Sequence, residues 1–306
     1  MIASIIDIGT NSCRLMVASS ENNKVNTIIK KVELTRLGEG VNKSKQLLPE
    51  AMERTLKVLK DYKKTSDSFF SEKILAFATS AVRDSKNRDE FINLVKKETG
   101  IHIECISGIE EGKAAFVGGT SFLENVNSKI LLIDIGGGST EFSYGNAGKL
   151  PEYIKSLNIG AVRFQEIIES GKFNFSDLES LMIQELSKIN YLTEDYELLG
   201  VAASITGQIA IFNKEAYDPI KSHNKKLTKN MIESNFKMLK SMTREEILAL
   251  PSISEKRADV ILPGTFLLLK ILEIFKKDYI RTSEIDLLEG HFILNILKAS
   301  LWIIVK

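Results

Sequence analysis

The sequence predicts an α/β fold made of two similar domains that face each other across a cleft. Residues 7–12 (Asp-Ile-Gly-Thr-Asn-Ser) end a short apolar run, and residues 134–139 (Asp-Ile-Gly-Gly-Gly-Ser) end another in the second half. In each half, three strand-like segments precede alternating helices and strands, which is typical of a sheet of mixed direction. The chain of 306 residues is also long enough for two domains, each with its own core.

The first half is expected to begin with three strands, because its opening segments are apolar and a Glu-Asn-Asn turn separates the second from the third. From Pro49 onward, apolar residues recur at the spacing of an amphipathic helix. The expected order is strands 2–8, 12–19 and 24–36, helix 49–70, strand 74–78, helix 88–98, strand 101–106 and a helix from residue 109.

The second half repeats this order, so both halves resemble the ribonuclease-H-like unit. We expect Pro263-Gly264 to interrupt the last long helix, because Pro lacks the N–H that continues a helix. We conjecture that a helix from about residue 284 returns to the first domain. The expected elements are strands 129–135, 140–144 and 150–157, helices 161–169 and 176–189, strand 198–202, a helix after 204, helices 229–239, 244–249 and 258–275, and strand 279–282. The expected domains are 1–122, completed by 284–306, and 123–283.

The composition is that of a globular protein with no bias toward a polyanion. Lys and Arg number 41 and Asp and Glu 40, for a formal charge of +1, so the net charge says nothing about a polyanionic partner. We expect no nucleic acid polymer as a partner. The basic segment 221–229 either attracts phosphate chains or is a solvated loop. Cys13 and Cys105 indicate neither a disulfide framework nor a zinc site.

The chain shows no pattern of a secretion signal, since its N-terminus enters a strand at once. The apolar stretch 292–305 contains Asn295 and Lys298 and is shorter than the ~20 residues of a membrane-spanning helix. We therefore expect no membrane association and a cytoplasmic location.

The two repeated turns suit a metal-complexed phosphate. In residues 7–12, Asp7 can hold a divalent cation or its waters, while Asn11, Ser12 and the amides near Gly9 can contact phosphate oxygens. A single turn of this kind would more simply be a hairpin turn, but the second Asp, Asp134, argues against that interpretation.

The second turn carries three consecutive glycines, which a purely structural turn would rarely need. Close approach of the backbone to a ligand explains them better, and Glu141 in the following strand can orient a metal-bound water; an exposed strand carboxylate is the alternative. Gly136, Gly137 and Gly138 are therefore the residues of this turn that we expect to approach a ligand.

Two further segments lead from a strand into a helix. At residues 78–84, Ser80 and the free amides of a helix start can bind an anion, and Arg83 adds a planar charged donor. A simple cap and a surface ion pair are the alternative. At residues 106–113, Glu110 and Glu111 point about a quarter-turn apart, so that one can enter a cleft and activate water. Otherwise both merely complement the helix dipole.

Taken in this order, these segments resemble the exopolyphosphatase and guanosine-pentaphosphate phosphohydrolase family, within the wider superfamily of actin, Hsp70 and sugar kinases. The matching segments are residues 7–12, 37–41, 79–84, 107–112, 134–141 and 257–264. The resemblance implies two actin-like domains, a phosphate channel between them, and Mg²⁺-dependent release of orthophosphate from polyphosphate or guanosine pentaphosphate. The chain resembles the short form that lacks extra C-terminal domains. The sequence leaves both a monomer and a homodimer open.

The resemblance also implies residue roles. Glu111 corresponds to the catalytic base, Asp134 to the metal-associated aspartate and Glu141 to a second required carboxylate; Arg83 joins the catalytic set and Asp7 the metal site. By the same matching, phosphates would be held by Asn11, Ser12, Ser80, Arg83 and the backbone of Gly136, Gly137, Gly138, Ser139 and Thr140. The chain departs from the family at Ala202-Ala203-Ser204, where a Gly-Gly-Thr loop is common, and at Leu288, where an Arg commonly precedes Glu-Gly.

The first departure favours polyphosphate over a nucleotide as substrate, because the two methyl groups of Ala202 and Ala203 would narrow access to the backbone of the loop. An ATP-dependent small-molecule kinase of the same fold remains an alternative, since it carries the same repeated turns. A sensor that binds guanosine tetraphosphate or polyphosphate without hydrolysis is the third, although the set of Glu111, Asp134 and Glu141 argues against it.

Overall fold

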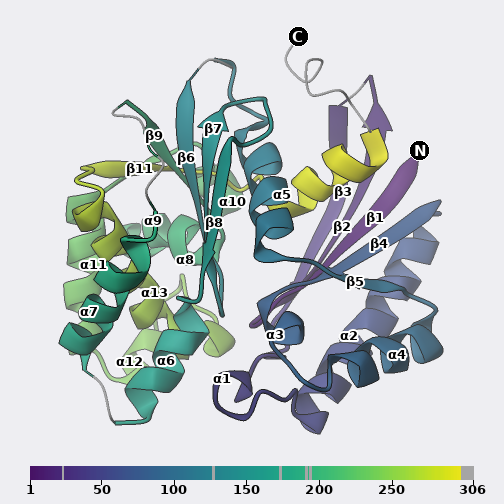
Figure 1. Cartoon of the computed structure of the whole chain (residues 1–306), viewed down its shortest axis with the longest axis horizontal. Helices are drawn as coiled ribbons and strands as arrows, with labels where there is room; N and C mark the ends of the chain where they lie inside the picture. Colours follow the sequence, from purple (N-terminus) through teal and green to yellow (C-terminus); the bar gives the residue numbers. More distant parts are fainter. Residues whose placement is uncertain (23, 126–127, 172–173, 190–191, 193–194, 298–306) are drawn as a thin grey trace.

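The computed structural model describes the chain except for residues 23, 126–127, 172–173, 190–191, 193–194 and 298–306. It contains two mixed sheets with a pair of helices between them and further helices outside (Figure 1). The first sheet has the strand order β3-β2-β1-β4-β5. Its strands are β1 (Ile2–Ile8), β2 (Cys13–Glu21), β3 (Lys24–Glu33), β4 (Lys73–Ala78) and β5 (Ile103–Cys105).

The second sheet repeats this arrangement and adds one strand. Its order is β10-β11-β9-β6-β7-β8, so β6, β7, β8, β9 and β11 take the places of β1 to β5. In both sheets the first three strands are antiparallel, and the first strand pairs in parallel with the fourth. The prediction of two ribonuclease-H-like units is thus confirmed. The strands are β6 (Lys129–Ile135), β7 (Thr140–Asn146), β8 (Tyr153–Leu157), β9 (Glu197–Val201), β10 (Lys226–Thr228) and β11 (Tyr279–Thr282).

The helices of the first half follow the predicted amphipathic pattern. In α2 (Pro49–Ser68), Met52, Leu59 and Tyr62 are buried against the first sheet, where Tyr62 donates a hydrogen bond to the carbonyl of Cys13 at 2.9 Å. The helix start predicted at residues 78–84 is α3 (Ser80–Arg83), whereas the sequence pattern missed the one-turn helix α1 (Val41–Ser44), because four residues are too few to show a period. The helices are α1, α2, α3, α4 (Arg88–Thr99) and α5 (Gly108–Thr120).

The helices of the second half include one that the sequence pattern divided. Helix α13 (Ala258–Ile274) runs through Pro263, so the predicted interruption is wrong. Pro263 lies near the start of the helix and removes one hydrogen bond, while the buried apolar residues of α13 keep the helix packed on both sides. The others are α6 (Ala161–Glu169), α7 (Phe175–Leu186), α8 (Ala203–Thr206), α9 (Gln208–Asn213), α10 (Pro219–Ser222), α11 (Lys229–Ser241) and α12 (Arg244–Leu248).

Two helices lie between the sheets and cross between the halves of the chain. Helix α5 packs Ala114, Ala115 and Phe116 against β6 and β9 of the second sheet, whereas α14 (Leu287–Phe292) packs Leu288 and Phe292 against the first sheet. The helices touch through glycines, since a Cβ on Gly290 would lie only 1.8 Å from the Ala114 carbonyl oxygen. The domain boundaries stay a prediction, and residues 298–306 of the proposed closing segment lie outside the described residues.

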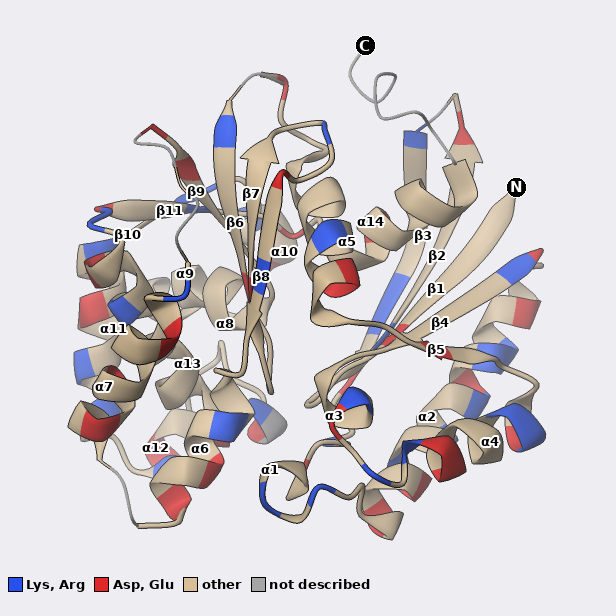
Figure 2. Ribbon diagram, viewed as in Figure 1, with Lys and Arg blue, Asp and Glu red and all other residues tan. Residues whose placement is uncertain are grey.

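Charged residues of both signs intermix on the outer helices, such as α2, α4 and α11 (Figure 2). This distribution matches a chain with nearly equal numbers of acidic and basic residues. Among the described residues, no helix is both long and apolar enough to cross a membrane.

Candidate active site

A cavity of about 680 Å³ lies where the repeated turns of the two sheets meet. The turns have the same internal hydrogen bond: the Gly9 amide donates to the Ser12 carbonyl at 2.9 Å, and the Gly136 amide to the Ser139 carbonyl at 3.0 Å. The cavity therefore lies at the ends of equivalent strands, β1 and β6. The predicted residues that line it are Asp7, Asn11, Ser12, Ser80, Glu111, Asp134, Gly136, Gly137, Gly138 and Ser139.

The glycines let the two turns approach each other closely. A Cβ on Gly138 would lie 2.4 Å from the Ser80 hydroxyl oxygen, and one on Gly137 would lie 3.0 Å from Thr10 Cβ. Any larger residue would push the second-half turn away from the first half. The absence of side chains here is thus explained by contact across the cavity as well as by access for a ligand.

The two adjacent glutamates at the start of α5 have different surroundings. Ser107 caps the helix, and the Glu110 carboxylate accepts hydrogen bonds from the Ser107 amide at 2.7 Å and its hydroxyl at 2.8 Å. Glu110 is exposed, whereas Glu111 is 9% exposed and lines the cavity. The capping role therefore belongs to Glu110, and Glu111 is the carboxylate that faces the cavity.

Arg83 holds the Glu111 carboxylate. Its Nη1 lies 3.2 Å from Glu111 Oε2 and donates to the Ile106 carbonyl at 3.1 Å. Burial raises the pKa of Glu111 well above its usual value, the neighbouring Glu141 raises it further, and Arg83 opposes both effects. A carboxylate with a raised pKa is suited to accept a proton near neutral pH.

Asp134 and Glu141 face each other as a pair in the β6–β7 register. Glu141 is fully buried; Oε1 accepts a hydrogen bond from the Ser156 hydroxyl at 2.7 Å, and Oε2 has no partner among the described residues. Burial raises the pKa of Glu141 to about 7, against the lowering effect of Ser156. The pKa of Asp134 is raised well above its usual value by burial, then by Glu141 and Asp286.

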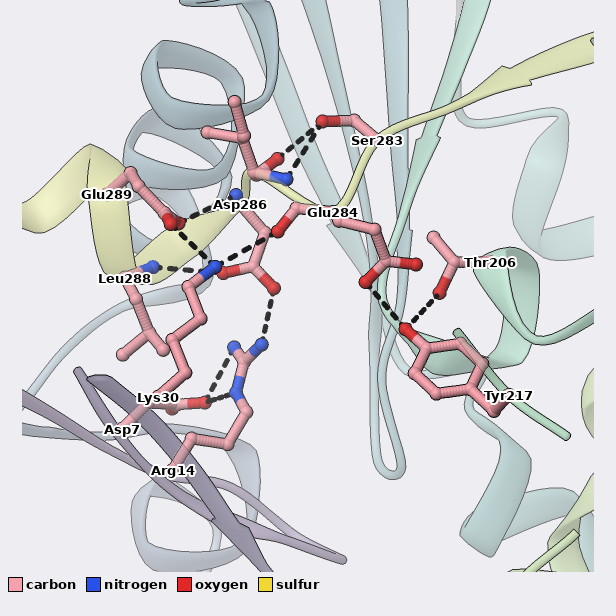
Figure 3. A network of polar contacts seen from close by, with 11 residues as sticks. Asp7, Arg14, Lys30, Thr206, Tyr217, Ser283, Glu284, Asp286, Leu288 and Glu289 are labelled. Carbon is pink, nitrogen blue, oxygen red and sulfur yellow. Dashed lines mark hydrogen bonds and ion pairs between the residues drawn. The ribbon is translucent and has the colours of Figure 1, made fainter. Parts of the chain in front are cut away.

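Asp7 belongs to a network that the sequence pattern did not reveal (Figure 3). Arg14 on β2 donates from Nε to Asp7 Oδ2 at 2.8 Å and also pairs with Asp286, the residue before α14. Burial raises the pKa of Asp7, and Arg14 opposes the rise. A charged residue inside the apolar segment 13–18 was the available signal for Arg14, whereas nothing local marks Asp286.

Lys30 extends this network toward the C-terminal segment. Its Nζ lies 2.5 Å from Glu289 Oε1 and donates to the Glu284 carbonyl at 3.0 Å (Figure 3). Whereas Lys30 contacts the backbone carbonyl of Glu284, the side chain of Glu284 accepts a hydrogen bond at Oε2 from the Tyr217 hydroxyl at 2.6 Å. Lys30, Tyr217 and Glu284 all line the cavity, and none of them was predicted as a site residue.

The structure does not place every predicted residue in the cavity. Thr140 is fully buried and its hydroxyl donates to the Ile159 carbonyl at 2.6 Å, so that side chain lies with the second-half core. Arg83 and Glu141 do not line the cavity themselves. Each lies next to a residue that does, because Arg83 contacts Glu111 and Glu141 is opposite Asp134 in the sheet. Ala202 lines the cavity in an unusual backbone conformation, with φ 65° and ψ 159°.

A divalent cation fits the donor set only with help from a bound ligand. The described residues contain no group of three or more His, Cys, Asp or Glu side chains arranged to hold a metal. Yet Asp7 Oδ1 and Glu141 Oε2 are buried oxygens without hydrogen-bond partners. Mg²⁺ is commonly held by one or two carboxylates together with waters and substrate phosphates, and this donor set suits such binding.

Comparison with known proteins identifies the family. The model of the Ppx/GppA phosphatase family matches residues 16–299. The chain belongs to the Ppx/GppA phosphatase family. The structure of an Aquifex aeolicus Ppx/GppA family member superimposes with a TM-score of 0.81 at 34% identity, covering 97% of this chain and 98% of that one. The prediction of a phosphoanhydride-hydrolysing enzyme is thereby confirmed at the level of the family.

Two relatives of this chain have names that describe a phosphatase activity. A Mycobacterium tuberculosis protein named exopolyphosphatase 2 is 29% identical, over 93% of this chain and 95% of its own. A Fusobacterium nucleatum protein named bifunctional 3-dehydroquinate synthase/phosphatase is 43% identical over 93% of this chain. This chain spans only 45% of that relative's length.

Proposed function

We propose that this Ppx/GppA family protein is an exopolyphosphatase, which hydrolyses the terminal phosphoanhydride bond of inorganic polyphosphate and releases orthophosphate. The observation that carries the proposal is Glu111, a buried carboxylate that lines the cavity beside Arg83 and has a raised pKa. The name of the M. tuberculosis relative supports polyphosphate as the substrate. We also expect a cytoplasmic location, and gel filtration tests whether the chain forms a homodimer.

In this proposal, Glu111 orients a water molecule and accepts its proton as the water attacks the terminal phosphorus. The P–O bond to the rest of the chain breaks, and the shortened polyphosphate leaves. Arg83 keeps the Glu111 carboxylate in place through the contact of its Nη1 with Glu111 Oε2. The protein forms no covalent bond to the phosphate in this step. Its main contribution to catalysis is therefore to position the base and the attacking water.

The remaining cavity residues would hold the phosphates. Asn11, Ser12, Ser80 and the amides of the turn at 136–139 can donate hydrogen bonds to phosphate oxygens. Asp134, with Asp7 and Glu141, would hold Mg²⁺ or its waters, and the metal would supply charge neutralisation to the phosphate chain.

A phosphate-release assay with Mg²⁺ tests the proposal on short polyphosphate, long polyphosphate and guanosine pentaphosphate side by side. Release from polyphosphate with higher kcat/KM than from guanosine pentaphosphate is expected. A higher kcat/KM for guanosine pentaphosphate would instead make the protein a guanosine pentaphosphate phosphohydrolase. Stoichiometric ADP formation that requires a sugar or acid acceptor would make the protein a kinase, and tight binding without any release would make it a sensor.

A further inference from the structure

Helix α6 carries a residue that joins the two halves of the molecule beside the cavity. Arg163, in the first turn of α6, has a side chain that is only 14% exposed. All three groups of its guanidinium are engaged: Nε donates to the Gly138 carbonyl at 2.8 Å, Nη1 to Asn42 at 2.5 Å, and Nη2 to Asp84 Oδ2 at 3.1 Å. One side chain therefore connects the glycine turn to helices α1 and α3.

The glycine turn and α6 are attached firmly to each other. The amides of Ala161, Val162 and Arg163 donate to the carbonyls of Gly136 and Gly137 at 2.9 to 3.1 Å. Arg163 thus has a fixed position relative to the turn that carries the second-half phosphate donors. Its contact with Asp84 therefore fixes the glycine turn relative to the end of helix α3 in the first half.

Asp84 lies between two arginines. Its Oδ2 pairs with Arg163, while its Oδ1 is 3.9 Å from Nε of Arg83. Arg83 in turn lies between two carboxylates, Asp84 and Glu111, and is nearer to Glu111 at 3.2 Å. If Arg163 were absent, the charge of Asp84 would have Arg83 as its nearest cation in this cluster.

We propose, on the basis of the proposed phosphoanhydride hydrolysis, that Arg163 is a positioning residue: by pairing with Asp84 it leaves Arg83 free to hold the Glu111 carboxylate. Arg163 acts through Asp84 and Arg83 and does not itself contact the reacting atoms. The arrangement also ties the placement of the candidate base to the glycine turn of the other half, because the same guanidinium binds the Gly138 carbonyl.

The test compares steady-state kinetics of Arg163→Gln with those of the double variant Arg163→Gln/Asp84→Asn. For R163Q we expect kcat to fall about 10- to 100-fold, since small misplacements of catalytic groups cost this much, with a much smaller change in KM. The double variant should recover most of the lost kcat, because the uncharged amide introduced by D84N no longer attracts Arg83. A double variant as slow as R163Q would overturn the proposal.

Two single variants separate positioning from simple contact between the halves. Arg163→Lys keeps the charge next to Asp84 and should retain more kcat than R163Q. Glu166→Ala, on the same helix, removes the hydrogen bond from the Gly40 amide at 2.9 Å but leaves Asp84 paired. An equal loss of kcat in E166A and R163Q would mean that breaking any contact between the two halves lowers kcat, whether or not Asp84 stays paired. That result would contradict the proposal.

A crystal structure of R163Q gives a reading that does not depend on activity. Arg83 turned from Glu111 to Asp84 supports the proposal, and Arg83 unchanged on Glu111 overturns it. If the unsubstituted protein released phosphate from neither polyphosphate nor guanosine pentaphosphate, the proposed function would fail, and this structural result would still decide the role of Arg163.

Discussion

The Arg83 guanidinium lies 3.2 Å from the Glu111 carboxylate and also donates to the carbonyl of Ile106, the residue that precedes the Ser107 cap of α5. The pair thereby links two strand-to-helix turns, the one from β4 into α3 and the one from β5 into α5. Because Arg83 touches both the carboxylate and the backbone that leads into its helix, it limits where Glu111 can point. The orientation of the candidate base thus depends on a neighbouring turn.

Replacing Glu111 by Gln should remove proton transfer while keeping the size of the side chain. We expect kcat for phosphate release from polyphosphate to fall about 10²- to 10⁴-fold, the range typical of general-base removal, with a small change in KM. Glu110→Gln is the matched control, since Glu110 is the exposed neighbour that caps the helix. Steady-state kinetics of both variants measure the effect, and equal turnover in E111Q and the unsubstituted protein would remove Glu111 from the role.

The pH dependence of turnover should report the Arg83–Glu111 pair. A base works when deprotonated, so kcat should rise with pH through the pKa of Glu111. Arg83 lowers that pKa, and its replacement by Gln should therefore move the acid limb of the profile to higher pH. Arg83→Lys, which retains the charge, should keep the limb closer to its original position. An acid limb that does not move in R83Q would assign the titration to another group.

The Mg²⁺ concentration that the protein needs for activity should be set in part by Asp134. Chelation of divalent cations should abolish phosphate release, and Mg²⁺ should restore it. In Asp134→Asn we expect the Mg²⁺ concentration for half-activation to rise about 10- to 100-fold, as for other groups that orient a bound metal. A Mg²⁺ titration of activity at fixed polyphosphate measures this shift. An unchanged half-activation concentration would place the metal away from Asp134.

The order of strands was predictable because it follows from local patterns repeated twice. The repeated Asp-Ile-Gly turns marked the ends of β1 and β6, and those ends do lie at one cavity. Residue type and spacing indicated only that one of Glu110 and Glu111 could enter a cleft, and the family resemblance identified Glu111 as that residue. Pro263 was misjudged because local propensity ignores the packing that holds α13 together.

The charged partners of the site could not be predicted, because they are distant in sequence. Arg14 pairs with Asp286, and Arg163 pairs with Asp84. Only the packing of α14 on the first sheet and of the glycine turn on α3 brings these residues together. No local pattern encodes such contacts. The same limit applies to the side chain of Thr140, whose hydroxyl donates to the Ile159 carbonyl inside the core; phosphate binding by its backbone stays a prediction.

Ala202→Gly should stabilise the protein. Ala202 has φ 65° and ψ 159°, a region that is essentially restricted to glycine, and it lies where the family commonly has a Gly-Gly-Thr loop. Relief of this strain, of about 1–3 kcal/mol, exceeds the roughly 0.4–1 kcal/mol that glycine adds to the entropy of the unfolded chain. We therefore expect the free energy of unfolding in urea to rise by about 1 kcal/mol.

Ala203→Gly is the matched control, because Ala203 is the first residue of helix α8 and its neighbour carries the strain. That variant should lose about 0.5–1 kcal/mol, since glycine is less favourable than alanine in a helix. We expect opposite signs for the two adjacent Ala→Gly substitutions because Ala202 has a positive φ and Ala203 does not. A loss of stability in A202G would mean that contacts of the Ala202 methyl group in the cavity wall outweigh the strain of its backbone.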